Sequence, residues 1–224
     1  MQLEKTTKVR QSEEKRRYDD ACGLAHALEL LGERWAMLVM RELAYGPRRF
    51  SELKADLQRI SANVLTQRLT ELEARGLVRK VRLPPPASVQ VYQATEWGLE
   101  AIPVIASLGR WAARSPMHDP TLPMSHVSTI MSLQTLLSPA LAEGLDARIG
   151  FRLGEADYVT TLHYGRLDVE RGEVTGCDVT FIGAPTAVVG VIHGGAPFET
   201  IRVEGDLDLA RRFVKLFPLP AKLS

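Results

Sequence analysis

Residues 22–97 carry an ordered series of short segments, and their order is the strongest constraint on what this chain can fold into. Apolar residues recur every three or four positions from 24 to 38, which predicts one amphipathic helix that runs to the Gly-Pro break at 46–47. A shorter stretch at 50–57 has the same spacing. Two helices joined by a tight break therefore open the fold.

The segments that follow predict a third helix and a hairpin. Ser61 is placed to cap a helix that reaches residue 75, where Gly76 can end it. Two strand-forming segments, 78–83 and 89–93, then flank the loop PPPAS, and Thr95 is placed to cap a further helix. This order predicts a winged helix-turn-helix, in which the second helix of the turn can enter a DNA major groove.

The second half of the chain has a different pattern. A helix is predicted at 127–141, and segments rich in Val, Thr, Tyr and Ile follow between glycines. A helix at 185–193, a strand reading IRVEG and a last helix near Asp206 complete the pattern. We therefore expect an α+β fold for the whole chain, with a C-terminal antiparallel sheet and packed helices.

Charge divides the chain at the same place. Up to residue 115 there are 19 Lys and Arg against 14 Asp and Glu, whereas beyond it there are 9 against 13. With the proline-rich stretch after Ser115, this predicts an arm at 1–20, a winged helix-turn-helix at 21–115, a linker at 116–123 and a second domain at 124–224. No apolar run suits a signal peptide or a membrane helix, so we expect a cytoplasmic protein with no membrane partner.

The predicted DNA contacts lie on the helix 61–75 and on the hairpin. Amide and hydroxyl side chains suit base edges, while arginine and lysine suit phosphates and the minor groove. The candidates are Arg48, Arg49, Ser61, Asn63, Thr66, Gln67, Arg68, Arg79, Lys80 and Arg82. Any amphipathic helix has a solvated polar face, so the prediction depends on the ordered set and not on one residue.

Residues 22–113 resemble the HxlR-type winged helix-turn-helix regulators, which are related to the MarR group. The resemblance is carried by LLGERWAMLVMREL, GPRRFSELKADL, ISANVLTQRLTELEARGLV and the closing VYQATEWG with LGRW. It implies a homodimer that binds a palindromic operator in double-stranded DNA. It also implies that the dimer forms through the segments 20–45 and 95–114.

The C-terminal half resembles the sterol-carrier-protein type 2 fold, on the segments GCDVTFIGAPTAVVGVI and IRVEGDLDLARRFVKLF. Such a domain holds an apolar ligand between sheet and helices. The side chains expected around that ligand are Phe151, Leu162, Phe181, Val188, Ile192, Phe213 and Phe217. The alternative is that the same side chains form a simply packed core.

Cys22 stands at a helix start, where a thiolate is stabilised, so it is the redox candidate; a small packing residue is the alternative. The five histidines and two cysteines show no metal-ligand spacing, and no nucleophile, phosphate-binding or dinucleotide motif is present. We expect no metal, no cofactor and no enzymatic activity.

These observations favour a homodimeric transcriptional regulator that responds to a hydrophobic small molecule. Two alternatives stay open. The C-terminal domain could serve only to assemble the dimer. It could also be a lipid carrier or an enzyme, with a winged helix that contacts protein rather than DNA.

Overall fold

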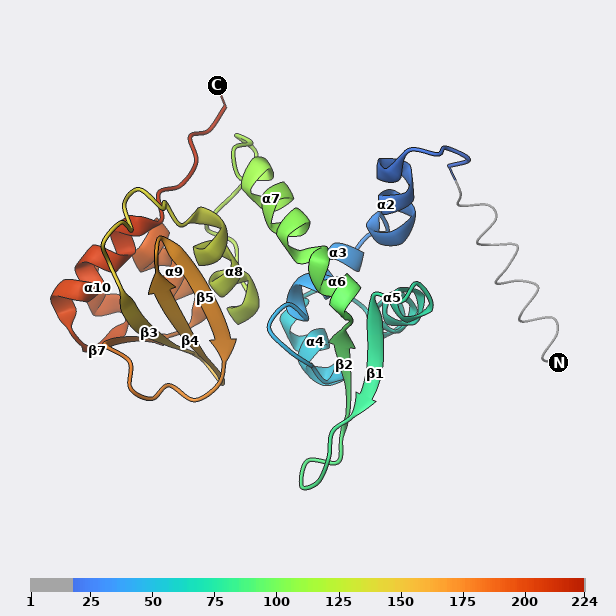
Figure 1. Cartoon of the computed structure of the whole chain (residues 1–224), viewed down its shortest axis with the longest axis horizontal. Helices are drawn as coiled ribbons and strands as arrows, with labels where there is room; N and C mark the ends of the chain where they lie inside the picture. Colours follow the sequence, from blue (N-terminus) through green and yellow to red (C-terminus); the bar gives the residue numbers. More distant parts are fainter. Residues whose placement is uncertain (1–17, 224) are drawn as a thin grey trace.

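The computed structural model of the chain describes residues 18–223, which form two hydrophobic cores (Figure 1). Residues 1–17, most of the predicted arm, lie outside the described residues. One core belongs to the helix-turn-helix region and the other to the C-terminal sheet and its helices. No described helix is long and apolar enough to cross a membrane.

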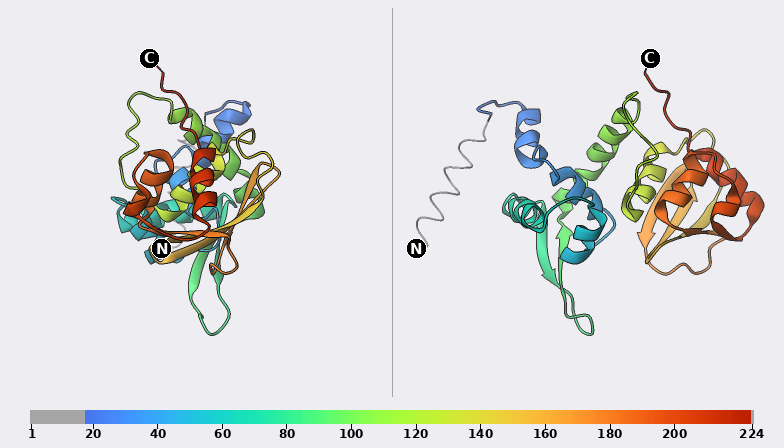
Figure 2. Two further views of the ribbon diagram at one scale, coloured as in Figure 1. Left: turned by 90° about the vertical axis from the view of Figure 1, so that its left-hand side faces the viewer. Right: turned by 180° about the vertical axis from the view of Figure 1, so that it is seen from behind.

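The first core is built by short helices and a two-stranded wing. The elements are α2 (Gly23–Leu31), α3 (Ala36–Glu42), α4 (Phe50–Asp56), α5 (Ala62–Ala74), β1 (Val78–Arg82), β2 (Gln90–Ala94), α6 (Glu96–Glu100) and α7 (Ile102–Ala112). The strands pair antiparallel, with Lys80 opposite Tyr92, which confirms the predicted hairpin. The loop at the wing tip projects away from the helices (Figures 1 and 2).

The prediction of one continuous helix from residue 24 is wrong, because the chain breaks between α2 and α3. The amide of Gly32 ends α2 by donating to the Leu28 carbonyl oxygen at 2.8 Å. Trp35 then takes a left-handed conformation, with φ of 79°. The apolar spacing continues through the break, but the break turns α3 relative to α2. Leu24 is therefore 68% exposed instead of buried.

The predicted caps of α5 and α6 are confirmed. The Ser61 hydroxyl accepts from the Val64 amide at 3.2 Å, and Gly76 follows α5 with φ of +74°. The Thr95 hydroxyl accepts from the Gly98 amide at 3.0 Å. The helix after Thr95 is split at Ala101 into α6 and α7, because Pro103 starts a helix well but cannot continue one.

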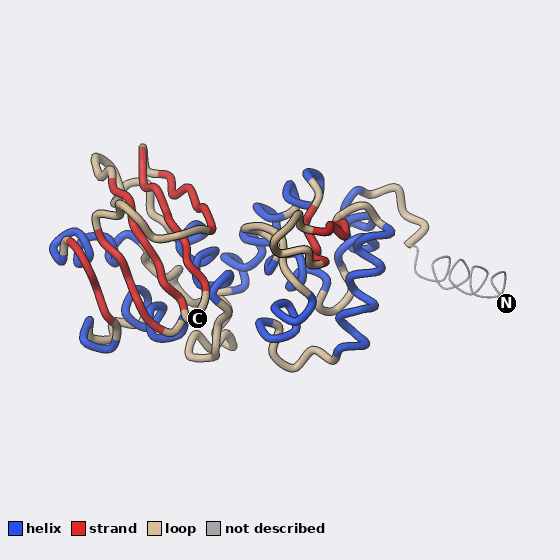
Figure 3. The backbone as a smooth tube through the Cα atoms, turned by 90° about the horizontal axis from the view of Figure 1, so that it is seen from below, coloured by secondary structure: helices blue, strands red, loops and turns tan. Residues whose placement is uncertain are grey.

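The C-terminal domain has a five-stranded sheet in the order β5-β4-β3-β6-β7 (Figure 3). Its elements are α8 (His126–Leu136), β3 (Ala147–Leu153), β4 (Ala156–His163), β5 (Arg166–Arg171), β6 (Val179–Gly183), α9 (Pro185–His193), β7 (Arg202–Gly205) and α10 (Leu207–Phe213), with short 3-10 turns at Phe198–Thr200 and Val214–Leu216. The helix predicted at 127–141 thus begins and ends earlier. Helices α9 and α10 pack against β6 on one face of the sheet, as Figure 2 shows.

The sheet is mixed, which corrects the predicted antiparallel sheet. β3, β4 and β5 form an antiparallel meander, but β6 pairs with β3 in parallel, with Phe151 opposite Phe181. The chain must therefore cross the sheet between β5 and β6. Gly150 makes room for this crossing, because a Cβ at that position would lie 2.2 Å from the Val174 side chain. The strand propensity of a segment does not indicate which strand it pairs with or in which direction, so the sequence pattern could not predict that β6 pairs with β3 in parallel.

Candidate DNA-binding surface

Helix α5 is amphipathic, with one apolar face and an opposite polar face. Leu65, Leu69 and Leu72 are buried in the first core, at 1% exposure or less. Ser61, Asn63, Thr66, Gln67 and Thr70 are exposed. The Gln67 amide donates to the Glu71 carboxylate at 3.0 Å, a weak exposed contact within one helix. The structure therefore brings the predicted base-reading side chains together on one open surface.

Arg68 is not part of that open surface. It is 6% exposed, and its guanidinium forms ion pairs with Glu71 at 2.5 Å and with Glu33 at 3.2 Å. Its position three residues after Leu65 and four before Leu72 places it on the inner side of α5. The sequence marks Arg68 only as polar, so the inward position could not be read from its type. The expected phosphate contact is not available in this conformation.

Arg48 is also turned inward, at 3% exposure. Its guanidinium pairs with Asp56 at the end of α4 and lies 2.9 Å from the imidazole of His126, which belongs to the other domain. Its backbone forms an isolated bridge with Tyr92 of the wing. Arg49, the next residue, is exposed. Only one of the two arginines at the entrance of α4 is therefore free to meet phosphate.

The wing carries the remaining predicted cations on its surface. Arg79, Lys80 and Arg82 are all exposed. Arg79 donates to the Gln93 side chain across the hairpin at 3.2 Å, and Lys80 lies 3.7 Å from Glu73. Such exposed contacts contribute little to stability, so these side chains can exchange them for phosphate oxygens.

Sequence reasoning missed two arginines beside α5. A groove of about 530 Å³ runs along the start of this helix, and Glu33, Arg34, Trp35, Arg59, Ser61, Val64, Gln67 and Arg68 line it. Arg34 and Arg59 are exposed, and Arg59 takes a left-handed conformation with φ of 72° in the turn before α5. The Arg34 guanidinium lies 5.7 Å from the centre of the Trp35 ring. The break between α2 and α3 brings Arg34 here, and no periodicity signals that break.

This surface can bind a polyanion and can discriminate between bases. Its cations on the wing and in the groove flank amides and hydroxyls of α5. Contacts between these cations and phosphates supply affinity that falls with salt. Contacts between the amides and base edges supply sequence preference. In the described part of the chain, no group of three or more His, Cys, Asp or Glu side chains is arranged to hold a metal ion.

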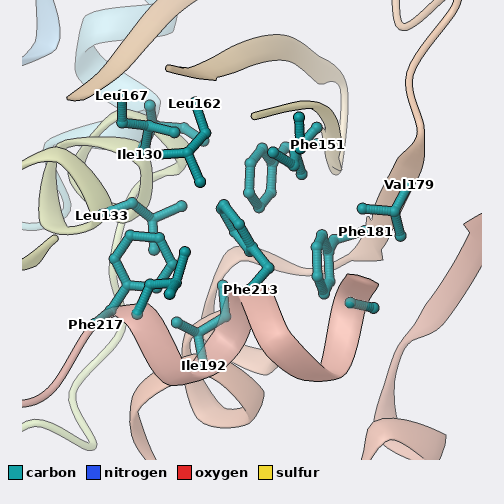
Figure 4. Packing of buried hydrophobic residues seen from close by; sticks show 14 of the residues in the cluster. Ile130, Leu133, Phe151, Leu162, Leu167, Val179, Phe181, Ile192, Phe213 and Phe217 are labelled. Carbon is teal, nitrogen blue, oxygen red and sulfur yellow. The ribbon is translucent and has the colours of Figure 1, made fainter. Parts of the chain in front are cut away.

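The seven side chains predicted to line an apolar ligand site all belong to the C-terminal core. Figure 4 shows Phe151, Phe181, Phe213 and Phe217 packed together. Phe151 and Phe181 are stacked with ring centres 5.4 Å apart, and Phe213 and Phe217 meet edge to face at 4.8 Å. These rings pack directly against one another, in stacked and edge-to-face geometry, as in a closely packed interior.

Cys22 is exposed and occupies the N-cap position of α2, as predicted. Cys177 is half-buried in the loop that crosses the sheet between β5 and β6, and burial raises the pKa of its thiol. A raised pKa lowers the thiolate fraction of Cys177 and therefore the reactivity of this thiol.

Known proteins resemble the first domain of this chain. The family described as HxlR-like helix-turn-helix matches residues 30–119. The uncharacterized HTH-type transcriptional regulator YvaP of Bacillus subtilis is 35% identical over 86 residues, which are 38% of this chain and 80% of YvaP. YkvN, another uncharacterized HTH-type transcriptional regulator of that organism, is 40% identical over 92 residues, or 41% of this chain and 77% of YkvN.

Among solved structures, the reduced form of the transcriptional regulator YodB from B. subtilis is 32% identical. The overlap covers 45% of this chain and 100% of that YodB chain, with a TM-score of 0.40. The two curated relatives are both named as HTH-type transcriptional regulators.

Proposed function

Because this chain belongs to the HxlR-like family of helix-turn-helix transcriptional regulators, we propose that it binds operator DNA through α5 and the wing. One observation carries the proposal: the polar face of α5 is exposed between a groove with Arg34 and Arg59 and a wing with three exposed cations. Helix α5 enters the major groove, where Asn63 and Gln67 read base edges.

The test of DNA binding is the salt dependence of duplex affinity. Fluorescence anisotropy with a genomic fragment found by footprinting, and with a scrambled duplex of equal length, measures both affinity and preference. We expect both affinities to fall steeply between low and high salt, since phosphate contacts release counterions. A protein that binds neither duplex would contradict the proposal, and the protein-contact alternative would replace it.

We further propose a homodimer that reads a palindromic operator. Its support is the apolar surface left on α2 and α7, which project from the same end of the domain, opposite the wing (Figures 1 and 2). Val104, Leu108 and Trp111 follow one face of α7 and are 69%, 44% and 69% exposed. No residue of α7 is buried within the described chain. An apolar stripe of this kind marks a protein contact.

For the C-terminal domain, we propose a role exerted through its contacts with the winged helix. The direct packing of Phe151, Phe181 and Phe213 favours a filled core over a preformed ligand site. The resemblance to the sterol-carrier type, and the response to a hydrophobic small molecule that it implies, remain predictions. The match to the HxlR-like family ends at residue 119 and does not bear on them.

The effector prediction can be tested on the full chain. An apolar fluorescent probe is titrated into the protein, with fatty-acyl and sterol-like compounds as competitors. A filled core predicts no saturable, competitor-sensitive binding and no change in DNA affinity. Saturable binding that a competitor reverses, together with altered DNA affinity, would restore the sensor hypothesis.

A further inference from the structure

A buried polar cluster, here called the joint, connects the two domains. It consists of Glu42, Arg48 and Asp56 from the winged-helix side and Ser125, His126 and Tyr158 from the C-terminal side. Glu42, Arg48 and Tyr158 are almost fully buried, with 1%, 3% and 0% exposure. Removing one partner of a buried charge pair is strongly destabilising, because it leaves the other charge uncompensated.

Arg48 forms the winged-helix half of the joint. Its guanidinium pairs with Asp56, lies 3.4 Å from Glu52, and reaches His126 of the other domain at 2.9 Å. Burial acts to raise the pKa of the Asp56 carboxyl, but the neighbouring His126 and Arg48 outweigh it and hold that pKa below its ordinary value. Asp56 thus stays charged beside Arg48.

The backbone of Arg48 is equally constrained. Its amide donates to the Tyr92 carbonyl oxygen, and the Tyr92 amide donates back to the Arg48 carbonyl oxygen, both at 2.8 Å. Tyr92 belongs to β2 of the wing, while Arg48 directly precedes the N-cap of α4. One residue therefore ties the wing, α4 and the C-terminal domain together.

His126 forms the C-terminal half of the joint. Nε2 of His126 lies 2.9 Å from the Arg48 guanidinium and 3.4 Å from the Asp56 carboxylate, and Nδ1 lies 2.6 Å from the Tyr158 hydroxyl. Tyr158 lies on β4, and its ring is part of the C-terminal core. A continuous series of contacts thus runs from that core to the wing.

A second contact fixes the start of α8 against α3. The Glu42 carboxylate accepts from Arg41 and from the Ser125 hydroxyl, both at 2.8 Å. Ser125 also caps α8 by accepting from the Ser128 amide at 3.0 Å. Since His126 is the first residue of α8, this contact holds its ring in register with Arg48.

We propose that the joint regulates DNA binding: His126 holds Arg48, and Arg48 fixes the wing relative to α4, so that release of the C-terminal domain lowers DNA affinity. This inference rests on the proposed function. A wing held in its binding position loses less conformational freedom on DNA, which favours the complex. The short relatives match the winged helix alone, so this control belongs to the two-domain chain.

The experiment compares three variants of the full chain. His126→Ala removes the imidazole that contacts Arg48, Asp56 and Tyr158, and His126→Gln restores an acceptor and a donor at similar reach. His163→Ala is the matched control, because His163 lies in the same domain but is exposed, and its side chain pairs with exposed Asp146 at 2.7 Å and contacts the Tyr164 ring. Duplex affinity and hydrogen exchange of 48–56 and 90–94 are measured at one pH and salt concentration.

We expect His126→Ala to weaken DNA binding about five- to tenfold, in the lower range of allosteric coupling, and to speed exchange at 90–94. His126→Gln and His163→Ala should stay within about twofold of the wild type. If His126→Ala fails to fold, Tyr158→Phe replaces it, since that change removes only the hydroxyl that orients His126.

Unchanged DNA affinity in a folded His126→Ala or Tyr158→Phe protein would overturn the proposal, and so would an equal loss in His163→Ala. A wild type that binds no duplex would instead overturn the proposed function. In that case, the exchange rates at 90–94 still decide whether the joint fixes the wing: equal rates in wild type and variant reject it.

Discussion

The two domains differ in how completely they bury their apolar side chains. In the C-terminal domain, the large aromatic residues at the sheet, Phe151, Phe181 and Phe213, are all fully buried. In the winged-helix region, Trp97 is 47% and Trp111 is 69% exposed, together with leucines of α2 and α7. A domain that leaves an apolar stripe exposed is suited to bind a protein partner, whereas a domain with a closed core is suited to hold a neighbouring domain in place. The difference is consistent with the proposals that the first domain binds partners and that the second domain positions it.

The largest effect is expected in the C-terminal core, where the stability of core variants tests whether this core is closely packed. Phe213→Ala should lower the free energy of unfolding by about 3–5 kcal/mol. The Phe213 ring contacts three other phenylalanines, and its removal leaves a cavity among them. Leu141→Ala, which removes a 56% exposed side chain in the same domain, should change it by less than about 0.5 kcal/mol. Denaturant unfolding measures both. A tolerated Phe213→Ala would show that the core is loosely filled.

The next prediction concerns the uncovered stripe. Trp111→Glu should weaken the dimer about a hundredfold or more, because burying an unpaired carboxylate at the interface costs several kcal/mol. Sedimentation across a range of concentrations measures this. Leu141→Glu is the control, since Leu141 is a 56% exposed apolar residue in the other domain, against 69% for Trp111. A folded Trp111→Glu protein that remains a dimer would move the interface elsewhere.

A smaller effect is expected to distinguish the base-reading residues from the phosphate-binding residues of the proposed DNA-binding surface. Gln67→Ala should reduce discrimination between operator and scrambled duplex about tenfold, within the roughly 1–3 kcal/mol of a good amide–base contact. Arg82→Ala should weaken both duplexes equally and lower the salt slope by about one unit. Arg34→Ala and Arg59→Ala are expected to resemble Arg82→Ala. Equal losses on both duplexes for Gln67→Ala would contradict the assignment of α5 as the reading helix.

The smallest expected effect is that of oxidants. Peroxide should alter DNA affinity only through Cys22, which is exposed at the N-cap of α2, beside the proposed dimer surface. Affinity is compared before and after peroxide in the wild type, in Cys22→Ser and in Cys177→Ser. If peroxide leaves the wild type unaffected, Cys22 is a packing residue; if it acts in Cys22→Ser, another group is oxidised.

Local sequence patterns were enough to predict most secondary-structure elements of the first domain. Ser61 and Thr95 cap helices because a hydroxyl before a helix can satisfy a free amide, and this depends on neighbours a few positions away. The wing, α5 and the closing helices follow from the same short-range signals. Asn63, Thr66 and Gln67 were placed on an exposed face for the same reason: the leucines on α5 define the opposite one.

Only the tertiary structure decided which polar side chains are free. Arg48 and Arg49 are adjacent and identical in type, yet one is buried in the joint and the other is exposed. The partner that buries Arg48 is His126, 78 residues away, and sequence spacing carries no information on such a contact. The parallel pairing of β3 and β6 and the filled aromatic core have the same cause, since both depend on packing between distant segments.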